Sequence, residues 1–372
     1  MLLKNGNILY DDFTFRSGDL SISGGKITFD DTSSKDVIDC TDCYVVPGLI
    51  DIHTHGAEGF DALDGSFEAI DEISKFMASN GVTTYLPNIM TQSHENMLAA
   101  AKSVREAYKK GVGGANIGGI YMEGPYFSEK HKGAQNFNYL RLPSTKEFDE
   151  LNAASGNLVR IISLAPELDG AFDFIKAKKD TVRIAMGHTD ADYDTAMTAI
   201  SLGASVLTHS FNAMRGLHHR NPNAIGAALD GGIFCECICD GFHLSGTVVR
   251  MLYKTVGADK MVLISDNIRA TGLPDGVCDS GGLEVFIKNG EARLADGTIA
   301  GSTTPLLSCM KKAVTFGVKL EDAFKMASLN PAKAAGIDDI TGSLTEGKRA
   351  DVLILNKDLS IKNVIIGGRI YK

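Results

Sequence analysis

The chain has 372 residues, of which 44% are hydrophobic and 22% charged, a balance typical of a folded globular protein and not of a disordered one. Its 37 basic residues are outnumbered by 46 acidic ones, and the net charge of −9 without any basic run argues against nucleic acid and anionic membranes as partners. We find no run of about 18 apolar residues and no signal-like pattern in MLLKNGNILY, so we expect a cytoplasmic protein with no membrane span.

Short strands separated by turn residues begin and end the chain. The segments are LLKNGNILYDDF, DLSISGGKITF, RADVLILNKD and IKNVIIGGRIYK. Their Asn-Gly, Gly-Gly and Asn-Lys-Asp turns are typical of hairpins. We therefore expect residues 1–46 and 341–372 to build one small β-sandwich domain from both chain termini.

Apolar runs alternate with helix-like stretches in the region between these ends. The expected strands are Val45–Ile52, Thr83–Asn88, Ile117–Gly124, Leu158–Glu167, Val182–His188, Ser205–His209, Ile233–His243 and Met261–Asp266. Asp192–Leu202 and Gly246–Val256 are long enough to be helices between strands, and Gly281–Thr298 contains hairpin material after the eighth strand. This order predicts an α/β protein with a (β/α)₈ TIM-like barrel over residues 47–340.

The seven cysteines, an odd number, do not indicate a disulfide framework. Cys40 and Cys43 form a single C-x-x-C without a second pair, which makes a structural zinc site improbable. Cys235, Cys237 and Cys239 alternate and so share one face of a strand. We expect all seven to be ordinary thiols, mostly small buried side chains.

Histidines and acids follow most of the expected strands. They are His53 and His55 after the first, Glu123 after the third, His188 after the fifth, His209 after the sixth, His243 just beyond the seventh and Asp266 after the eighth. Because the C-terminal strand ends of such a barrel form its active site, we expect these side chains to meet at one rim.

Imidazole and carboxylate groups in this number predict a site for Zn²⁺, Fe²⁺, Mn²⁺ or Co²⁺. His53 and His55 lie two residues apart on a strand, so they point the same way and can bind one ion together. With Glu123 as a bridge, His53, His55 and Asp266 could hold one ion and His188 and His209 another, which leaves one or two ions per subunit open. Any single histidine could instead be a half-buried structural residue, but their repetition at strand ends favours metal.

A metal at this rim would lower the pKa of a bound water and polarise a substrate carbonyl. A further group must then move the proton to the leaving group. Asp266 has the right chemistry for this acid/base role. The alternatives are that Asp266 is only a metal ligand or caps a helix.

Several motifs together resemble the amidohydrolase superfamily of metal-dependent barrels, in particular its amino-sugar-phosphate deacetylases. They are VPGLIDIHTHG, EGPYFSEKHKGAQ, GHT, THSFNAMRGLHHRNPN, DGFH, SDNIRATGLPDG, IAGS and GSLTEGKRADVLILN. The resemblance implies removal of acetate from N-acetyl-D-glucosamine 6-phosphate in amino-sugar catabolism. It also implies that Glu123, His188 and His209 bind the principal metal, that His53 and His55 can hold a second ion and that Asp266 is the acid/base.

The resemblance further implies a set of substrate contacts. They are Ala134, Gln135, Asn212, Ala213, Arg220, His243 and Gly301. Gln135 stands where some members have a histidine beside the substrate carbonyl; a glutamine can donate a hydrogen bond there but cannot take up a proton or become charged. A second departure is Asn267 and Ile268 after the catalytic aspartate, where small and Met residues are common.

Phosphate binding is expected near LHHR, residues 217–220, the densest cationic spot in a loop on the reacting rim. Members of the family bind phosphate partly through an Arg and a His of a neighbouring subunit, so the resemblance implies a homodimer. The alternative for this segment is an ordinary solvated loop.

Two other functions compete with sugar-phosphate deacetylation. One is a different amide hydrolase on the same barrel, such as an N-acetylgalactosamine-6-phosphate deacetylase or an enzyme of the D-aminoacylase type, and the phosphate pocket discriminates these. The other is a barrel that has lost catalysis and acts as a binding protein. The presence of every candidate metal ligand argues against that last possibility.

Overall fold

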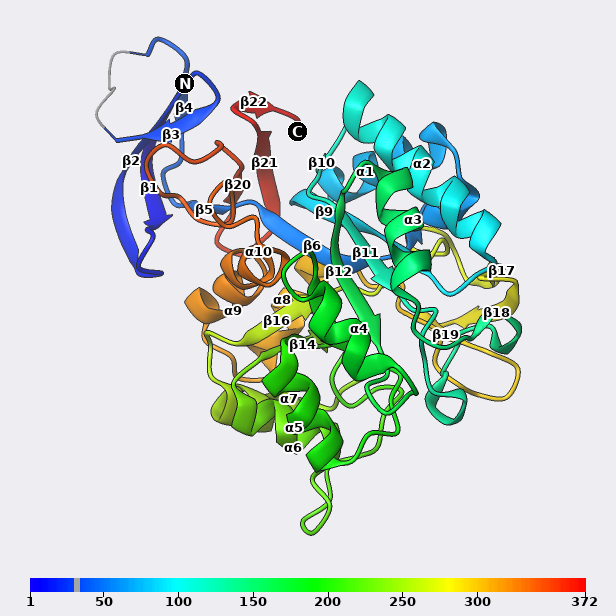
Figure 1. Ribbon diagram of the computed structural model, residues 1–372. Helices are drawn as coiled ribbons and strands as arrows, with labels where there is room; N and C mark the ends of the chain where they lie inside the picture. The colour runs from blue at the N-terminus through cyan, green and yellow to red at the C-terminus, as the bar shows by residue number, and fades with distance from the viewer. Residues whose placement is uncertain (30–33) are drawn as a thin grey trace.

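The computed structural model describes residues 1–29 and 34–372; residues 30–33, inside the predicted N-terminal part of the small domain, lie outside this description. In the described chain, parallel strands form a nearly closed eight-stranded barrel, as predicted (Figure 1). The barrel strands are β6 (Leu49–Thr54), β9 (Val82–Met90), β11 (Ile120–Glu123), β12 (Val159–Leu164), β13 (Arg183–Met186), β14 (Ala204–Leu207), β15 (Phe234–Ile238) and β16 (Met261–Ile264). The short β10 (Asn116–Ile117) pairs with β9.

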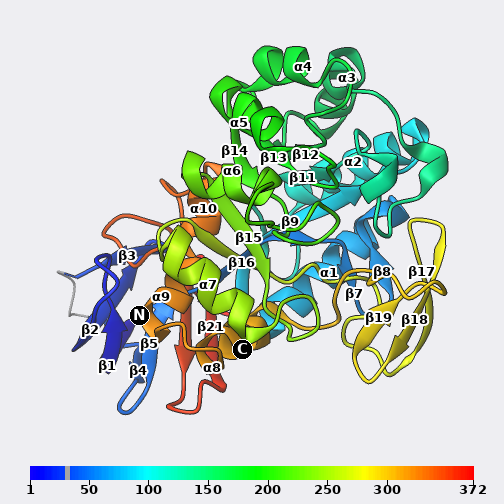
Figure 2. The ribbon, with the colours of Figure 1, turned by 90° about the horizontal axis from the view of Figure 1, so that it is seen from below.

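Helices surround the barrel and connect its strands (Figures 1 and 2). They are α1 (Phe67–Ser79), α2 (His94–Lys110), α3 (Thr145–Ser155), α4 (Ala171–Lys178), α5 (Tyr193–Leu202), α6 (Asn223–Gly231), α7 (Gly246–Val256), α8 (Leu306–Thr315), α9 (Leu320–Met326) and α10 (Leu329–Ala335). The two helices predicted from the sequence are confirmed as α5 and α7. Asp192 begins α5 as its N-cap, accepting from the Thr195 N–H.

Apolar side chains fill the inside of the barrel. They include Ile50, Ile52, Leu86, Tyr121, Ile161, Ala185, Val206, Ile238, Val262 and Ile264. Ala332, Ala334 and Ala335 of α10 belong to the same buried cluster and pack against it from the N-terminal end of the strands. The interior is therefore a packed core, and room for chemistry remains only at the C-terminal end.

The first predicted strand, Val45–Ile52, is wrong as a single element. Residues up to Pro47 form β5 (Tyr44–Pro47), which pairs antiparallel with β20 of the terminal sheet, whereas β6 begins at Leu49 in the barrel. Gly48 lies between them, where a Cβ would be 2.2 Å from the Thr83 side chain. The chain can cross from one sheet to the other here only because this residue has no side chain.

Both chain ends contribute to one sheet, which confirms the additional domain beside the barrel (Figure 1). Its strands are β1 (Leu2–Leu9), β2 (Phe15–Ser23), β3 (Lys26–Thr28), β4 (Val37–Asp39), β5, β20 (Val352–Leu355), β21 (Ile361–Ile366) and β22 (Arg369–Ile370). Cys40 and Cys43 are buried in its core. The change of sheet at Gly48 lies just after the proposed boundary at 46/47; the division into 1–46, 47–340 and 341–372 stays a prediction.

A separate three-stranded sheet follows the barrel; its last two strands form the hairpin predicted within Gly281–Thr298, and its first strand lies before that range. It consists of β17 (Gly276–Ser280), β18 (Leu283–Lys288) and β19 (Glu291–Arg293), and it lies at the opposite side of the molecule from the terminal sheet (Figure 2). The remaining short strands and 3₁₀ helices are β7 (Gly56–Ala57), β8 (Phe60–Asp61), η1 (Ala62–Asp64), η2 (Glu129–His131) and η3 (Phe137–Tyr139). No helix in the described ranges is long and apolar enough to cross a membrane.

Candidate metal centre

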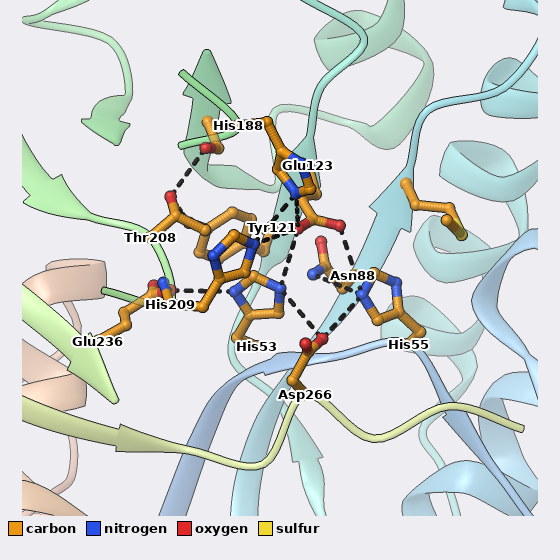
Figure 3. Close-up of polar contacts among 12 residues, drawn as sticks. His53, His55, Asn88, Tyr121, Glu123, His188, Thr208, His209, Glu236 and Asp266 are labelled. Carbon is orange, nitrogen blue, oxygen red and sulfur yellow. Dashed lines mark hydrogen bonds and ion pairs between the residues drawn. The ribbon is translucent and has the colours of Figure 1, made fainter. Parts of the chain in front are cut away.

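The side chains predicted at the strand ends meet in one cluster at the C-terminal rim of the barrel (Figure 3). His53 lies in β6 and Glu123 in β11, and the others follow within two residues of the ends of β6, β13, β14 and β16. All are buried: His53, His55, Glu123, His188, His209 and Asp266. Two overlapping groups among them, His53–His55–Glu123 and Glu123–His188–His209, offer ligand atoms within 4.8 Å of one another.

The first group consists of Glu123, His188 and His209. Glu123 Oε1 lies 3.1 Å from His188 Nε2 and 3.1 Å from His209 Nε2, and the two nitrogens are 3.1 Å apart. Ligands at about 2.0–2.1 Å from a tetrahedral zinc are roughly 3.3 Å from each other. The three atoms therefore have the spacing of one ion's ligands.

The second group places His53 and His55 against two carboxylates. His53 Nε2 is 3.5 Å from Glu123 Oε1 and 3.5 Å from Asp266 Oδ1. His55 Nε2 is 3.4 Å from Glu123 Oε2 and 3.2 Å from Asp266 Oδ1. Because the Glu123 carboxylate faces both groups, it is placed to bridge two ions.

The cluster fits a divalent cation by its chemistry as well as its spacing. Four imidazoles and two carboxylates are the donor set of Zn²⁺, Fe²⁺, Mn²⁺ or Co²⁺. His53 Nε2 points into the cluster, buried and without a hydrogen-bond partner. Such a buried polar atom is costly unless something binds it, and a metal ion would use its lone pair.

Both carboxylates are held in their ionised form. Burial by itself would raise the pKa of Glu123, but hydrogen bonds from His188 and His209 hold that pKa well below its usual range. Burial likewise opposes ionisation of Asp266, and the hydrogen bond from His55 with the charges of His53 and His55 outweighs it, so this pKa is also lowered. An ionised Asp266 is ready to accept a proton.

Neighbouring groups orient two of the candidate ligands. His188 Nδ1 lies 3.1 Å from the carbonyl oxygen of His131, to which it donates. Gln135 Nε2 donates to Glu123 Oε2 at 2.7 Å, and Gln135 Oε1 accepts from the Thr91 N–H at 3.1 Å. Gln135 thus aligns Glu123 through one amide hydrogen and keeps the other for the substrate contact, which stays a prediction.

A cavity of about 520 Å³ opens on the cluster. Six of the seven predicted substrate residues line it: Ala134, Gln135, Asn212, Ala213, His243 and Gly301. His243 is fixed by Asp240, whose Oδ2 lies 2.7 Å from His243 Nδ1. The Asn212 amide donates to the carbonyl oxygens of His209 and Ser210, both at 3.2 Å.

Arg220, the seventh predicted substrate residue, is not brought to this cavity. It is exposed, and its Nη1 lies 2.7 Å from His219 Nε2 of the same loop. The loop before α6 extends away from the barrel body (Figure 1). Within one chain, Arg220 therefore does not line the site that it was predicted to serve.

Three residues of the cluster have left-handed backbones. The φ angles of His188, His209 and Asp266 are 46°, 25° and 52°. Such values are uncommon for residues with a Cβ and persist only where surrounding contacts impose them. At Asp266 these contacts are its N–H to the His53 carbonyl at 2.9 Å and its carbonyl to the Ser302 N–H at 2.7 Å.

Replacing Gly301 with alanine is expected to destabilise the protein and lower turnover. Its φ is +65°, and a Cβ would be 2.6 Å from Ile268 Cγ2 and 2.9 Å from the Asp266 carbonyl oxygen. Gly297 is the matched control, because its φ of +89° imposes a similar strain but nothing lies within 4 Å. Gly297→Ala should cost only the strain of about 1–2 kcal/mol, and Gly301→Ala more, measured by denaturant unfolding. Equal losses in the two variants would contradict a packing role for Gly301.

Sequence reasoning missed two residues that touch the cluster. Glu236 Oε2 lies 3.0 Å from His53 Nδ1, and Asn88 Nδ2 lies 3.4 Å from His55 Nε2. A signal for the first was present: Cys235 and Cys237 share one face of β15, Cys239 follows directly after it, and all three pack in the large core cluster. Strand alternation places Glu236 on the opposite face, inside the barrel.

An eight-stranded barrel whose C-terminal rim holds two groups of histidines that share one glutamate is typical of a metal-dependent hydrolase. The model of the amidohydrolase family matches residues 44–371, and the chain belongs to that family. Its members depend on metal, in agreement with the cluster.

The chain is similar over most of its length to several deacetylases of amino-sugar phosphates. The chain is 37% identical over 382 residues to the N-acetylglucosamine-6-phosphate deacetylase of Bacillus subtilis, covering 100% of this chain and 96% of the relative. It is 36% identical to an N-acetylgalactosamine-6-phosphate deacetylase of Escherichia coli O157:H7, covering 87% and 86%. A mutant N-acetyl-D-glucosamine-6-phosphate deacetylase of Mycobacterium smegmatis, solved with N-acetyl-D-glucosamine-6-phosphate, matches with a TM-score of 0.93 and 31% identity over 100% and 99% of the two chains.

Proposed function

We propose that this protein hydrolyses the acetamide bond of N-acetyl-D-glucosamine 6-phosphate, giving D-glucosamine 6-phosphate and acetate in amino-sugar catabolism and recycling. The observation that carries the proposal is the Glu123-centred cluster on the wall of a 520 Å³ cavity. Full-length similarity to deacetylases of this substrate supports it.

We assign the principal ion to Glu123, His188 and His209, and a second ion, where present, to His53, His55 and Asp266 with Glu123 as bridge. Zn²⁺, Fe²⁺, Mn²⁺ and Co²⁺ all suit these donors, and an ion held there would lower the pKa of a bound water and polarise the amide carbonyl. Asp266 accepts the proton of the attacking water and returns it to the departing amine. Gln135 keeps the Glu123 carboxylate in line.

We further propose a homodimer in which Arg220 binds the phosphate in the partner's cavity. The support is its exposure, its position outside the cavity of its own chain and the planar guanidinium that suits phosphate oxygens. His243 and Asn212, which line the cavity of their own chain, would contact the sugar from the other side.

Mixing two variants, one impaired in phosphate binding and one in catalysis, tests this arrangement. Arg220→Ala is expected to raise KM for the phosphorylated sugar about 10- to 100-fold, the effect of about 1.4–2.7 kcal/mol of lost charge-assisted hydrogen bonding. In a mixed dimer with Asp266→Asn, one of the two sites would combine an intact Asp266 with an intact Arg220 from the other subunit. Activity should then return at low substrate. If the mixture is no more active at low substrate than its components, Arg220 does not act across subunits.

The galacto epimer is the second candidate substrate, because the galactosamine-type relative is nearly as similar as the glucosamine-type one. An acetate-release assay on N-acetylglucosamine 6-phosphate, its galacto epimer and the unphosphorylated sugar, with and without chelator, tests the function. We expect release from the gluco phosphate, loss of it with chelator and recovery with added metal. Preference for the galacto epimer would favour the second candidate, and no release from either phosphate by metal-loaded protein would reject both.

We also propose a cytoplasmic location. The seven cysteines are free thiols, six of them buried, which suits a reducing compartment. A sugar phosphate carries charge and does not cross a membrane unaided, so its hydrolase is expected where the phosphate is made.

A further inference from the structure

Glu236 is a fully buried carboxylate for which the proposed reaction has no use. It belongs to β15 and lies beside His53 and His209 of the metal cluster (Figure 3). A buried carboxylate is costly unless hydrogen bonds or charges compensate it. Two of its contacts, with His53 and with His209, indicate a role in the metal cluster.

The first contact is with the ring of His53. Glu236 Oε2 lies 3.0 Å from His53 Nδ1, and both side chains are 0% exposed. An ionised carboxylate only accepts hydrogen bonds, so the proton of a neutral His53 ring belongs on Nδ1. The Nε2 lone pair is then left facing Glu123 and Asp266, the form in which a histidine binds metal.

The second contact is with the backbone of His209. The same oxygen, Glu236 Oε2, accepts from the His209 N–H at 3.2 Å. His209 has a φ of +25°, so its backbone needs such contacts to hold the orientation that aims its ring at Glu123. One carboxylate oxygen therefore touches a member of each metal-binding group.

The ring of Tyr121 completes the support of His53. Its centroid lies 4.7 Å from that of His53, and its hydroxyl is 2.9 Å from the Thr208 hydroxyl. His53 is thus held against a ring on one side and by a charged acceptor at Nδ1. Both contacts are made by protein groups and need no bound ion.

We propose that Glu236 is a positioning residue that fixes the proton on His53 Nδ1 and the backbone of His209, and so raises the affinity of the cluster for divalent ions. The proposal rests on the metal site of the proposed function, but metal binding can be measured without any substrate. If the protein showed no deacetylase activity, this proposal could therefore still be correct. If Glu236 did not affect metal binding, the proposed substrate would not be affected.

The test titrates Zn²⁺ into metal-stripped protein in competition with a chromophoric chelator. Glu236→Met removes the acceptor at similar length and should weaken Zn²⁺ binding about 10- to 100-fold. Glu236→Gln can keep both hydrogen bonds through its carbonyl oxygen while losing the charge, so a smaller loss is expected. The absorption spectrum of bound Co²⁺ should also change in Glu236→Met, because the His53 ligand is no longer held in one orientation.

Asp240→Asn is the matched control, since Asp240 is a buried carboxylate just beyond the same strand that holds His243, outside the metal cluster. It should leave Zn²⁺ affinity unchanged. Unfolding of the metal-stripped variants distinguishes a role in metal binding from a purely structural one. A purely structural role would lower the stability of the variant without changing the Zn²⁺ affinity of its folded state. If Glu236→Met binds Zn²⁺ as tightly as the wild type, the proposal is wrong. If Glu236→Met does not fold, the proposal is tested on Glu236→Gln, and it is wrong if that variant binds Zn²⁺ as tightly as the wild type and Asp240→Asn do.

Discussion

Asp266→Asn is expected to lower kcat by about 10²- to 10⁴-fold, roughly 3–5 kcal/mol of barrier. The physical reason is that asparagine has the shape of the carboxylate but cannot accept and return a proton. The His55 and His53 contacts keep Asp266 ionised, which suits it to the proposed role of proton acceptor. Steady-state acetate release under saturating substrate measures the effect.

The metal content of Asp266→Asn distinguishes the loss of an acid/base group from the loss of a metal ligand. The principal group of Glu123, His188 and His209 does not include Asp266, so the variant should keep that ion. Asp149→Asn, at an exposed aspartate whose side chain is 58% accessible, should leave kcat unchanged. Near-wild-type turnover of Asp266→Asn would contradict the acid/base assignment, and full loss of metal would make Asp266 chiefly a ligand.

Glu123→Gln is expected to abolish metal binding and with it the activity. Glu123 is the residue shared by both groups of candidate ligands, and its two oxygens face different imidazoles. An amide in its place removes the negative charge and leaves only one ligand oxygen. Because a bound ion contributes several kcal/mol to such reactions, a fall of about 10³-fold or more in kcat/KM is expected.

Stability provides an independent check on Glu123. Ligands that bind only the folded state stabilise it, by about 2.7 kcal/mol at 100 times the dissociation constant. Chelator should therefore lower the Tm of the wild type but not that of Glu123→Gln, while Glu150→Gln, an exposed glutamate of α3, should behave as the wild type. A Glu123→Gln protein that retains stoichiometric metal would refute the bridging role.

The sequence was informative wherever a local pattern determines structure. Apolar runs ending in His or Glu located the barrel strands, and the C-terminal ends of parallel strands share one rim, so the convergence of His53, His55, Glu123, His188, His209 and Asp266 was predictable. The turn-rich ends of the chain likewise predicted a second sheet. Local hydrophobicity could not show that Val45 and Ile52 belong to different sheets, because both are buried apolar strand residues.

The sequence by itself determined the barrel, the types of the candidate metal-binding residues and their order along the chain, because strand alternation and strand ends follow from neighbouring residues. Only the tertiary structure decided which of these atoms face one another. Glu236 meets His53 across 183 positions of sequence and Gln135 meets the Glu123 carboxylate, whereas Arg220 lies away from the cavity of its own chain. Contacts of this kind depend on how distant segments pack, and no local pattern specifies them.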